Sequence, residues 1–339
     1  MTGKPGIDRT GWLQRWIEAR WYGGAPVPAW LSALSRLFAI VARHRRARQR
    51  SDATRLPVPV VVVGNLTVGG SGKTPVVIAL VESLRASGFT PGVISRGYGS
   101  SARGVRDVDA DDDPSATGDE PLLIARRTGV PVVVGRDRVG AARRLIGRHG
   151  VDVVVSDDGL QHYRLARDLE IVVVDGRRRF GNGRLLPAGP LREPLERLDE
   201  AGIVLVNGPR GSEETGFDLA LGSAWSLAGH PGRMLSSLAG TPVHAVAGIG
   251  DPVRFFDALR AKGFQVIEHA FPDHHAFVPD DLAFTDGHPV LMTEKDAVKC
   301  RRFARPDWYA VPVTAELPTA VVEKVSAILR SLPDPALPA

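Results

Sequence analysis

Apolar runs alternate with amphipathic segments along most of the chain, and this alternation predicts an α/β fold. Short runs rich in valine and isoleucine occupy residues 60–63, 90–95, 130–135, 151–155, 169–175, 201–207, 242–250 and 289–293. Continuous apolar runs of this length are typical of buried parallel strands. Helical spacing of apolar positions follows several of them, over residues 76–87, 252–262 and 318–332. We therefore expect parallel sheets flanked by helices.

The first 50 residues follow another pattern, because they contain four of the six tryptophans and two stripes of apolar residues at helical spacing. The stripes are Trp12, Leu13, Trp16 and Ile17, then Trp30, Leu31, Leu34, Leu37, Phe38 and Val41. A dense run of cations follows: Arg43, Arg45, Arg46, Arg48 and Arg50. Aromatic anchors beside cations are typical of helices that lie in an anionic membrane interface. A helix packed on the protein with a solvated basic end, or a nucleic-acid arm, is the alternative.

Composition narrows the class of protein. A length of 339 residues with 43% hydrophobic residues predicts a globular protein of two domains. Cys300 is the single cysteine, so an internal disulfide and a cysteine-based zinc site are excluded. No apolar run reaches the roughly 18 residues of a membrane span, and the N-terminus lacks the pattern of a secretory signal. The net charge of +5 is modest, but positive charge is unevenly distributed along the chain and is concentrated in the arginine run.

The strand at residues 60–63 leads into the glycine-rich sequence GNLTVGGSGKT, residues 64–74, and then into a helix. Strand, glycine turn and helix N-terminus together form the context of a phosphate-binding P-loop. Lys73 is placed to reach the outer phosphates and Thr74 to bind Mg²⁺. Thr67 stands where the usual pattern has its first glycine. The predicted nucleotide-binding residues are Thr67, Val68, Gly69, Gly70, Ser71, Gly72, Lys73 and Thr74.

Three further strand ends carry residues that suit a phosphate-transfer site. Asp157 and Asp158 follow a buried strand, where an acid of a P-loop protein holds Mg²⁺, although Asp-Asp-Gly is also a good turn sequence. Arg96 and Tyr98 lie in the glycine-rich loop after the strand at residues 90–95, where ligands of parallel sheets collect. Residues 180–194 combine glycines, prolines and arginines, Arg192 among them, in a pattern that suits an anion-holding loop.

Two other groups remain ambiguous from the residues alone. Asp119 and Glu120 begin a helix, where capping by itself explains their presence. His274 and His275 follow Asp273 and are consistent with a general base, a metal half-site or an ordinary core or surface histidine.

Eight motifs, in order along residues 10–330, resemble the tetraacyldisaccharide 4′-kinase family of the lipid A pathway of Gram-negative bacteria. They are GNLTVGGSGKT at residues 64–74, SRGY at 95–98, GDEP at 118–121, DDGLQH at 157–162, LLPAG at 185–189, LREP at 191–194, FPDH at 271–274 and TEKD at 293–296. The threonine at position 67 is itself a feature of the P-loop in this family.

The resemblance implies transfer of the ATP γ-phosphate to the 4′-hydroxyl of an acylated glucosamine disaccharide 1-phosphate. By matching motif, Asp119 is the base with His274 as its partner, Lys73 acts on the phosphates, and His275 is not catalytic. The implied metal ligands are Thr74, Glu120, Asp157 and Asp158, and the implied acceptor residues are Arg96, Tyr98, Gln161 and Arg192. ATP and Mg²⁺ are the implied cofactors.

The resemblance also implies an organisation and a location. Residues 1–50 form membrane-contacting helices, residues 51–165 with the closing helix 317–332 form the P-loop domain, and residues 166–316 form a smaller α/β domain. The protein is expected at the cytoplasmic face of the inner membrane as a peripheral protein, with no nucleic-acid partner and no obligate protein partner. A switch ATPase of the partitioning or metal-insertion type and a soluble small-molecule kinase are the alternatives.

Overall fold

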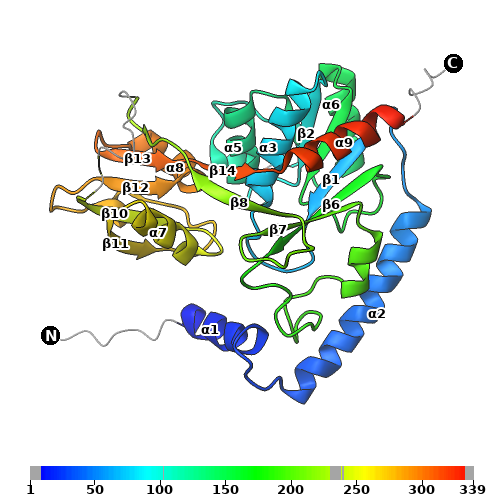
Figure 1. Ribbon diagram of the computed structural model, residues 1–339, viewed down its shortest axis with the longest axis horizontal. Helices are drawn as coiled ribbons and strands as arrows, with labels where there is room; N and C mark the ends of the chain where they lie inside the picture. Colours follow the sequence, from blue (N-terminus) through cyan, green and yellow to red (C-terminus); the bar gives the residue numbers. More distant parts are fainter. Residues whose placement is uncertain (1–8, 102, 230–237, 239, 333–339) are drawn as a thin grey trace.

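The computed structural model describes residues 9–101, 103–229, 238 and 240–332, which form two sheets and a pair of N-terminal helices (Figure 1). The larger sheet has nine strands in the order β14-β8-β7-β6-β1-β5-β2-β4-β3. Their bounds are β14 Val313–Glu316, β8 Gly216–Leu221, β7 Ile203–Asn207, β6 Leu169–Asp175, β1 Val60–Gly64, β5 Val153–Asp157, β2 Pro91–Ser95, β4 Val132–Val134 and β3 Arg106–Asp107. The strands from β8 to β4 are parallel, and β14 and β3 pair antiparallel at the edges.

Helices cover both faces of the larger sheet, so its central strands are buried on both sides and are apolar throughout. One core joins the sheet to α3 (Lys73–Ala86), α5 (Asp119–Thr128) and α9 (Thr319–Ser331). A second core joins the other face to α6 (Arg138–His149). The short helix α4 (Pro114–Thr117) precedes α5, and the 3₁₀ helix η1 (Leu195–Glu200) precedes β7. Val321 and Val325 of α9 belong to the first core, so this last helix packs on the larger sheet.

The smaller sheet has five strands in the order β11-β10-β12-β13-β9. Their bounds are β11 Gln265–Ala270, β10 Pro242–Ala247, β12 Val290–Thr293, β13 Trp308–Val311 and β9 Trp225–Ser226. α7 (Pro252–Ala261) packs on one face through Phe255, Phe256 and Leu259. α8 (Glu294–Cys300) packs on the other face, and the 3₁₀ helices η3 (Pro279–Leu282) and η4 (Arg301–Phe303) flank it.

The sheets divide the chain at another place than the expected boundary between residues 165 and 166. β6 and β7 lie after that boundary, yet β6 pairs with β1 in parallel, with Val61 opposite Leu169. β8 and β14 complete the same sheet, so the smaller sheet takes its strands only from residues 225–311. This expectation needs correction, because an apolar strand carries no mark of which sheet it joins; pairing decides that.

The two N-terminal helices extend from the body, with α2 (Ala29–Ser51) along one side and α1 (Arg9–Trp21) beyond its start (Figure 1). Side chains anchor them to the loop after β6. Trp21 Nε1 donates to the carbonyl of Pro187 at 3.2 Å and Ser35 Oγ donates to that of Leu185 at 2.8 Å. None of the described helices is long and apolar enough to cross a bilayer.

Candidate active site

The glycine-rich loop between β1 and α3 has the backbone of a phosphate cradle. Gly72 precedes the first residue of α3 with φ of 92°, a left-handed conformation that favours glycine. A Cβ at this position would stand 2.6 Å from Nδ2 of Asn207, which itself donates to the carbonyl of Ser71 at 3.0 Å. The last residue of β7 therefore holds the loop from behind, and only glycine fits between them.

Thr67 replaces the usual glycine because the start of this loop is extended and paired. Its backbone forms an isolated antiparallel bridge with Leu191, and the N–H of Val68 donates to the carbonyl of Pro190 at 2.9 Å. An extended residue gains nothing from the conformational freedom of glycine. The loop of residues 185–194 is thus bound directly to the phosphate cradle.

Acidic and basic side chains meet where β5 ends beside β1. Asp157 is the last residue of β5, and Asp158 follows it with φ of 47°. Lys73 Nζ lies 3.5 Å from Asp158 Oδ1. Arg192 Nη1 lies 3.4 Å from Asp158 Oδ1 and 3.4 Å from Gln161 Oε1. Parallel neighbours bring these motifs to one edge of the sheet, as the sequence predicted.

The donor set at this edge suits a magnesium ion that is shared with phosphates. Burial raises the pKa of Asp157, and the negative charges of Glu120 and Asp158 add to the effect. Asp157 Oδ1 is buried and accepts no hydrogen bond from any described residue. Within the part of the chain that the structure describes, no three acidic, histidine or cysteine side chains form a complete metal cage. Mg²⁺ commonly binds one or two carboxylates together with substrate phosphates and water, so a partial donor set fits this ion.

Asp119 and His274 meet across the two sheets. Asp119 is the first residue of α5, whereas His274 lies in the loop after β11, and His274 Nδ1 is 3.0 Å from Asp119 Oδ2. Burial tends to raise the pKa of Asp119, but the hydrogen bond from His274 and the charge of Lys295 outweigh it and lower that pKa. The same hydrogen bond raises the pKa of His274. Both shifts favour an ionised Asp119 carboxylate that accepts a hydrogen bond from His274 Nδ1.

Lys295 is a site residue that the sequence analysis placed only within a family motif. Its Nζ lies 2.9 Å from Glu120 Oε1, 3.1 Å from Asp273 Oδ1 and 3.5 Å from His274 Nε2. Burial tends to lower its pKa, but the charges of Glu120 and Asp119 outweigh burial and raise it. The sequence does contain a local signal for its position, the helix cap. Thr293 caps α8 by accepting the N–H of Asp296, and this cap places Lys295 in the first turn of the helix.

These groups surround one cleft of about 1180 Å³ between the two sheets. Its lining includes the phosphate cradle, Tyr98, Asp158, Arg192, His274 and Lys295. The sheets touch at the cradle, where a Cβ on Gly250 would stand 2.9 Å from the backbone nitrogen of Gly70. Arg254 of α7 also reaches Asp175 at the end of β6, with Nη2 2.9 Å from Oδ2.

The remaining candidate residues separate into those near the cleft and those away from it. Tyr98 lines the cleft, and its ring centroid is 5.0 Å from that of His274. Arg96 is exposed and is not part of the lining. Gln161 lies behind Arg192 and donates to the carbonyl of Asn65 at 3.1 Å. His275 turns toward Asp281, with Nε2 2.9 Å from Oδ2.

Phosphoryl transfer requires a phosphate cradle, positive charge around the phosphates and a group that receives the proton of the acceptor. One cleft of this fold joins the phosphate cradle to cationic side chains and to His274, which contacts the buried carboxylate of Asp119, and this arrangement defines the chain as a P-loop kinase. Residues 27–330 match the family model described as tetraacyldisaccharide-1-P 4′-kinase, and the chain belongs to this family.

Curated relatives and a solved structure agree with this assignment. The tetraacyldisaccharide 4′-kinase of Stenotrophomonas maltophilia (strain R551-3) is 55% identical over 88% of this chain and 92% of its own. That of Azoarcus sp. (strain BH72) is 51% identical over 93% and 96%. The crystal structure of LpxK from Aquifex aeolicus in complex with ATP is similar, with a TM-score of 0.73 and 28% identity, covering 88% of this chain and 98% of that one. The family predicted from the eight motifs is confirmed, and the switch ATPase and the soluble small-molecule kinase are excluded.

Proposed function

We propose that Asp119 is the general base when this kinase transfers the γ-phosphate of ATP to the 4′-hydroxyl of its tetraacyldisaccharide 1-phosphate acceptor. The observation that carries the proposal is the contact of 3.0 Å between Asp119, which is buried, and His274, which lines the same cleft as the phosphate cradle. His274 keeps the carboxylate ionised and oriented, because its imidazolium donates to one of the carboxylate oxygens.

The remaining roles follow from position. We propose that the loop of residues 67–74 binds the phosphates of ATP, and that Lys73 neutralises charge on the phosphoryl group in transfer. Thr74, Glu120, Asp157 and Asp158 would hold Mg²⁺, which supplies further charge neutralisation when it is bound. Arg192 and Tyr98 would contact the acceptor. Lys295 pairs with Glu120, a proposed metal ligand, and contacts His274, the partner of the base. It would therefore connect the metal ligands to the base.

The test measures transfer of labelled γ-phosphate from ATP to a tetraacyldisaccharide 1-phosphate in detergent micelles. Wild type is expected to label the lipid, and Asp119→Ala is expected to label it far more slowly. Equal rates for the two proteins would remove Asp119 from the mechanism. His275→Ala is the matched control, because His275 is the neighbouring histidine that contacts Asp281 and lines no part of the cleft.

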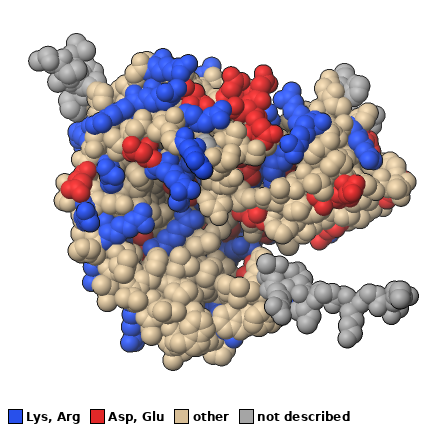
Figure 2. All heavy atoms as spheres, turned by 180° about the vertical axis from the view of Figure 1, so that it is seen from behind, with Lys and Arg blue, Asp and Glu red and all other residues tan. Residues whose placement is uncertain are grey.

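We also propose that α1 and α2 bind the anionic surface of the inner membrane at its cytoplasmic face, where ATP is available. One stripe of α2 exposes Trp30, Leu34, Leu37 and Val41, each by 47% or more. The lower part of the molecule in Figure 2, on the side of these helices, is mostly free of charge, and Lys and Arg gather above it. An acylated acceptor resides in the bilayer, so its kinase needs such a surface.

Replacing Trp30, Leu37 and Val41 together by serine is expected to weaken binding to anionic vesicles about 100-fold. Each side chain is more than half exposed in the structure, and its transfer into the interface contributes about 1 kcal/mol. Sedimentation with vesicles of phosphatidylglycerol and phosphatidylethanolamine measures the change. Ile267→Ser in β11 with Val278→Ser just before η3, on two exposed apolar residues, is the control. Unchanged binding of the α2 variant would contradict the proposal.

The two sheets, we propose, are lobes that close on ATP, with the division at the sheets and not at residue 166. Arg254 and Asp175 join the lobes at one point, and Gly70 and Gly250 approach each other at another. Such contacts at the ligand are typical of hinge closure around a nucleotide. Solution scattering is expected to show a smaller radius of gyration with Mg²⁺ and a non-hydrolysable ATP analogue. A radius that does not change with the analogue would contradict closure.

A further inference from the structure

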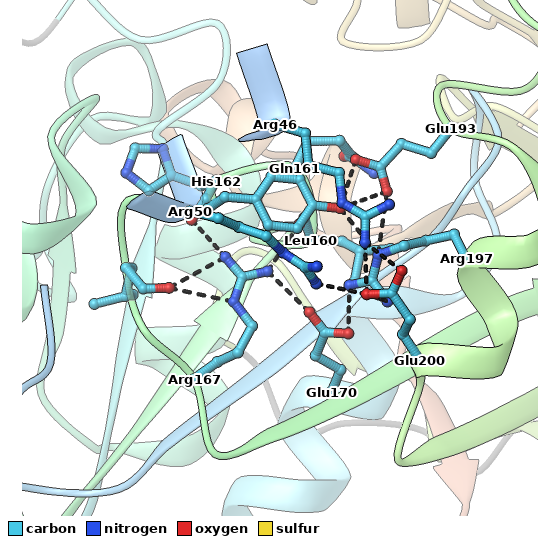
Figure 3. Close-up of polar contacts among 12 residues, drawn as sticks. Arg46, Arg50, Leu160, Gln161, His162, Arg167, Glu170, Glu193, Arg197 and Glu200 are labelled. Atoms are coloured by element: carbon cyan, nitrogen blue, oxygen red, sulfur yellow. Dashed lines mark hydrogen bonds and ion pairs between the residues drawn. The ribbon is translucent and has the colours of Figure 1, made fainter. Parts of the chain in front are cut away.

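A buried polar cluster lies behind the cleft wall and takes no part in the roles proposed above. It consists of Tyr163, Glu170, Glu193 and Arg197, which we name the Tyr163 cluster (Figure 3). The Tyr163 hydroxyl lies 2.7 Å from Glu193 Oε1, and Arg197 Nε donates to the same hydroxyl at 2.9 Å. Arg197 also donates to Glu170, and its side chain is fully buried. A charged group at this depth is stable only with partners, so the cluster must be complete.

The direction of each hydrogen bond in the cluster is fixed by charge. Burial raises the pKa of Tyr163 to about 12, and the negative charge of Glu193 adds to that effect. Tyr163 is therefore neutral, donates a hydrogen bond to Glu193 and accepts one from Arg197. Burial also raises the pKa of Glu193, although the Tyr163 hydrogen bond and the Arg197 charge act against it. The hydroxyl bridges the carboxylate and the guanidinium, which also lie 3.5 Å apart between Glu193 Oε2 and Arg197 Nε.

The cluster lies close in sequence to Gln161 on one segment and to the cleft residue Arg192 on another. Tyr163 stands two residues after Gln161, and Glu193 directly follows Arg192. Arg192, which lines the cleft, contacts both Gln161 and Asp158, as described above. The bond from Tyr163 to Glu193 thus joins the same two segments from behind. Losing it frees Arg192 to shift relative to Asp158.

The other side of the cluster faces the last turns of α2. Arg46 and Arg50 both donate to Glu200 of η1, and their guanidinium carbons lie 5.1 and 5.2 Å from the centre of the Tyr163 ring. The N–H of Tyr163 donates to Gln49 Oε1 at 3.3 Å. Two arginines of the basic run therefore contact the protein, with the Arg46 side chain 21% exposed and the Arg50 side chain 49% exposed. The last turns of α2 dock on the residue that joins the two cleft segments.

We propose that Tyr163 is a positioning residue, which holds Arg192 toward the acceptor through Glu193 and transmits the docking of α2 to the cleft. The inference rests on the proposed function, in which Arg192 contacts the acceptor. Because α2 also carries the exposed apolar stripe, this helix is connected through Tyr163 and Glu193 to Arg192, the residue proposed to contact the acceptor. Binding at a surface and alignment of Arg192 are then coupled.

Tyr163→Phe is expected to lower kcat/KM for the acceptor about tenfold, with KM for MgATP within twofold of wild type. Loss of a hydrogen bond between a hydroxyl and a charged group has an effect of this size. The phenyl ring keeps the packing, so the thermal midpoint serves as the check on folding. If KM rose equally for MgATP and for the acceptor, the variant would have loosened the whole site and the inference would be overturned.

A double-mutant cycle with Arg192→Ala separates positioning from mere stabilisation. If Tyr163 acts through Arg192, the double variant is no slower than Arg192→Ala alone. If the two effects multiply, Tyr163 acts elsewhere and the inference is overturned while the proposed function stands. If Arg192→Ala alone leaves the acceptor kinetics at wild-type values, the acceptor role of Arg192 is overturned, and the inference with it.

The α2 link has its own test in micelles, where attraction to an anionic bilayer plays no part. Arg46→Gln with Arg50→Gln is expected to lower kcat/KM for the acceptor several-fold, as Tyr163→Phe does. The control is Arg55→Gln with Arg302→Gln, which removes the same charge from two exposed ion pairs with Asp168 and Asp113. Wild-type kinetics for the Arg46 and Arg50 variant would overturn the transmission from α2.

Discussion

Asp119→Asn is expected to lower kcat for phosphate transfer by about 10³-fold, within the range of general-base catalysis. Asparagine has nearly the size of aspartate and fits the first turn of α5, so the cleft keeps its shape. It has no carboxylate to receive the hydroxyl proton. KM for MgATP should stay near its wild-type value, because the phosphate cradle lies on β1 and α3, not on α5. Steady-state kinetics with each substrate varied in turn measure both quantities.

His274→Ala separates the base from its support. We expect a loss of about tenfold, because Asp119 remains ionised at neutral pH beside Lys295 and Lys299 even without the imidazolium. Lys299 Nζ lies 3.9 Å from Asp119 Oδ2. A loss after His274→Ala as large as that after Asp119→Asn would reverse the assignment of base and partner. Asp119→Asn with at least a tenth of the wild-type kcat would place the base elsewhere.

The lowered pKa of Asp119 fits the chemistry of phosphoryl transfer. A weakly basic carboxylate removes little proton charge from an alcohol before the bond to phosphorus forms. The transition state for phosphoryl transfer is loose, so early deprotonation of the acceptor adds little to the rate. An oriented acceptor for the proton is enough, and the His274 contact supplies the orientation.

The sequence was sufficient wherever one short segment determines its own structure. The phosphate cradle, the acids at the end of β5 and the cap of α8 each depend on residues close together in the chain. Gly72 shows why, since its left-handed φ is a local demand that only glycine meets without strain. The eight motifs then identified the family, because so many short motifs rarely occur in the same order in unrelated proteins.

Long-range pairing was beyond the reach of local pattern. Asp119 and His274 are separated by 155 residues, and their contact depends on how two sheets sit against each other. β6 was expected in the smaller domain, because an apolar strand looks the same in either sheet. The rotation of α2 is a third case, since five arginines in eight residues cover every side of a helix. In the structure, Arg46 and Arg50 are the two arginines of the run that contact the Tyr163 ring and Glu200.

Lys73→Met is expected to lower kcat by about 10²- to 10³-fold, the usual effect of removing one preorganised charge from a transition state. The side chain is 12% exposed and lies 3.5 Å from Asp158, so it already counters the carboxylates before ATP binds. Methionine keeps the apolar stem and removes the charge. Asp157, Asp158 and Glu120 then repel one another more strongly, and the free protein should also unfold at a lower temperature.

A comparison with Asp158→Asn separates the effect of Lys73 on stability from its effect on catalysis. Asp158→Asn removes a negative charge from the same pair, so it should leave the thermal midpoint unchanged or raised while still slowing transfer. Lys73→Met should lower both the midpoint and kcat. Differential scanning fluorimetry and the labelled-phosphate assay on the two variants test this. If Lys73→Met transferred phosphate within tenfold of wild type, another cation of the cleft lining, such as Arg192 or Lys295, would have to neutralise the charge on the phosphoryl group in transfer.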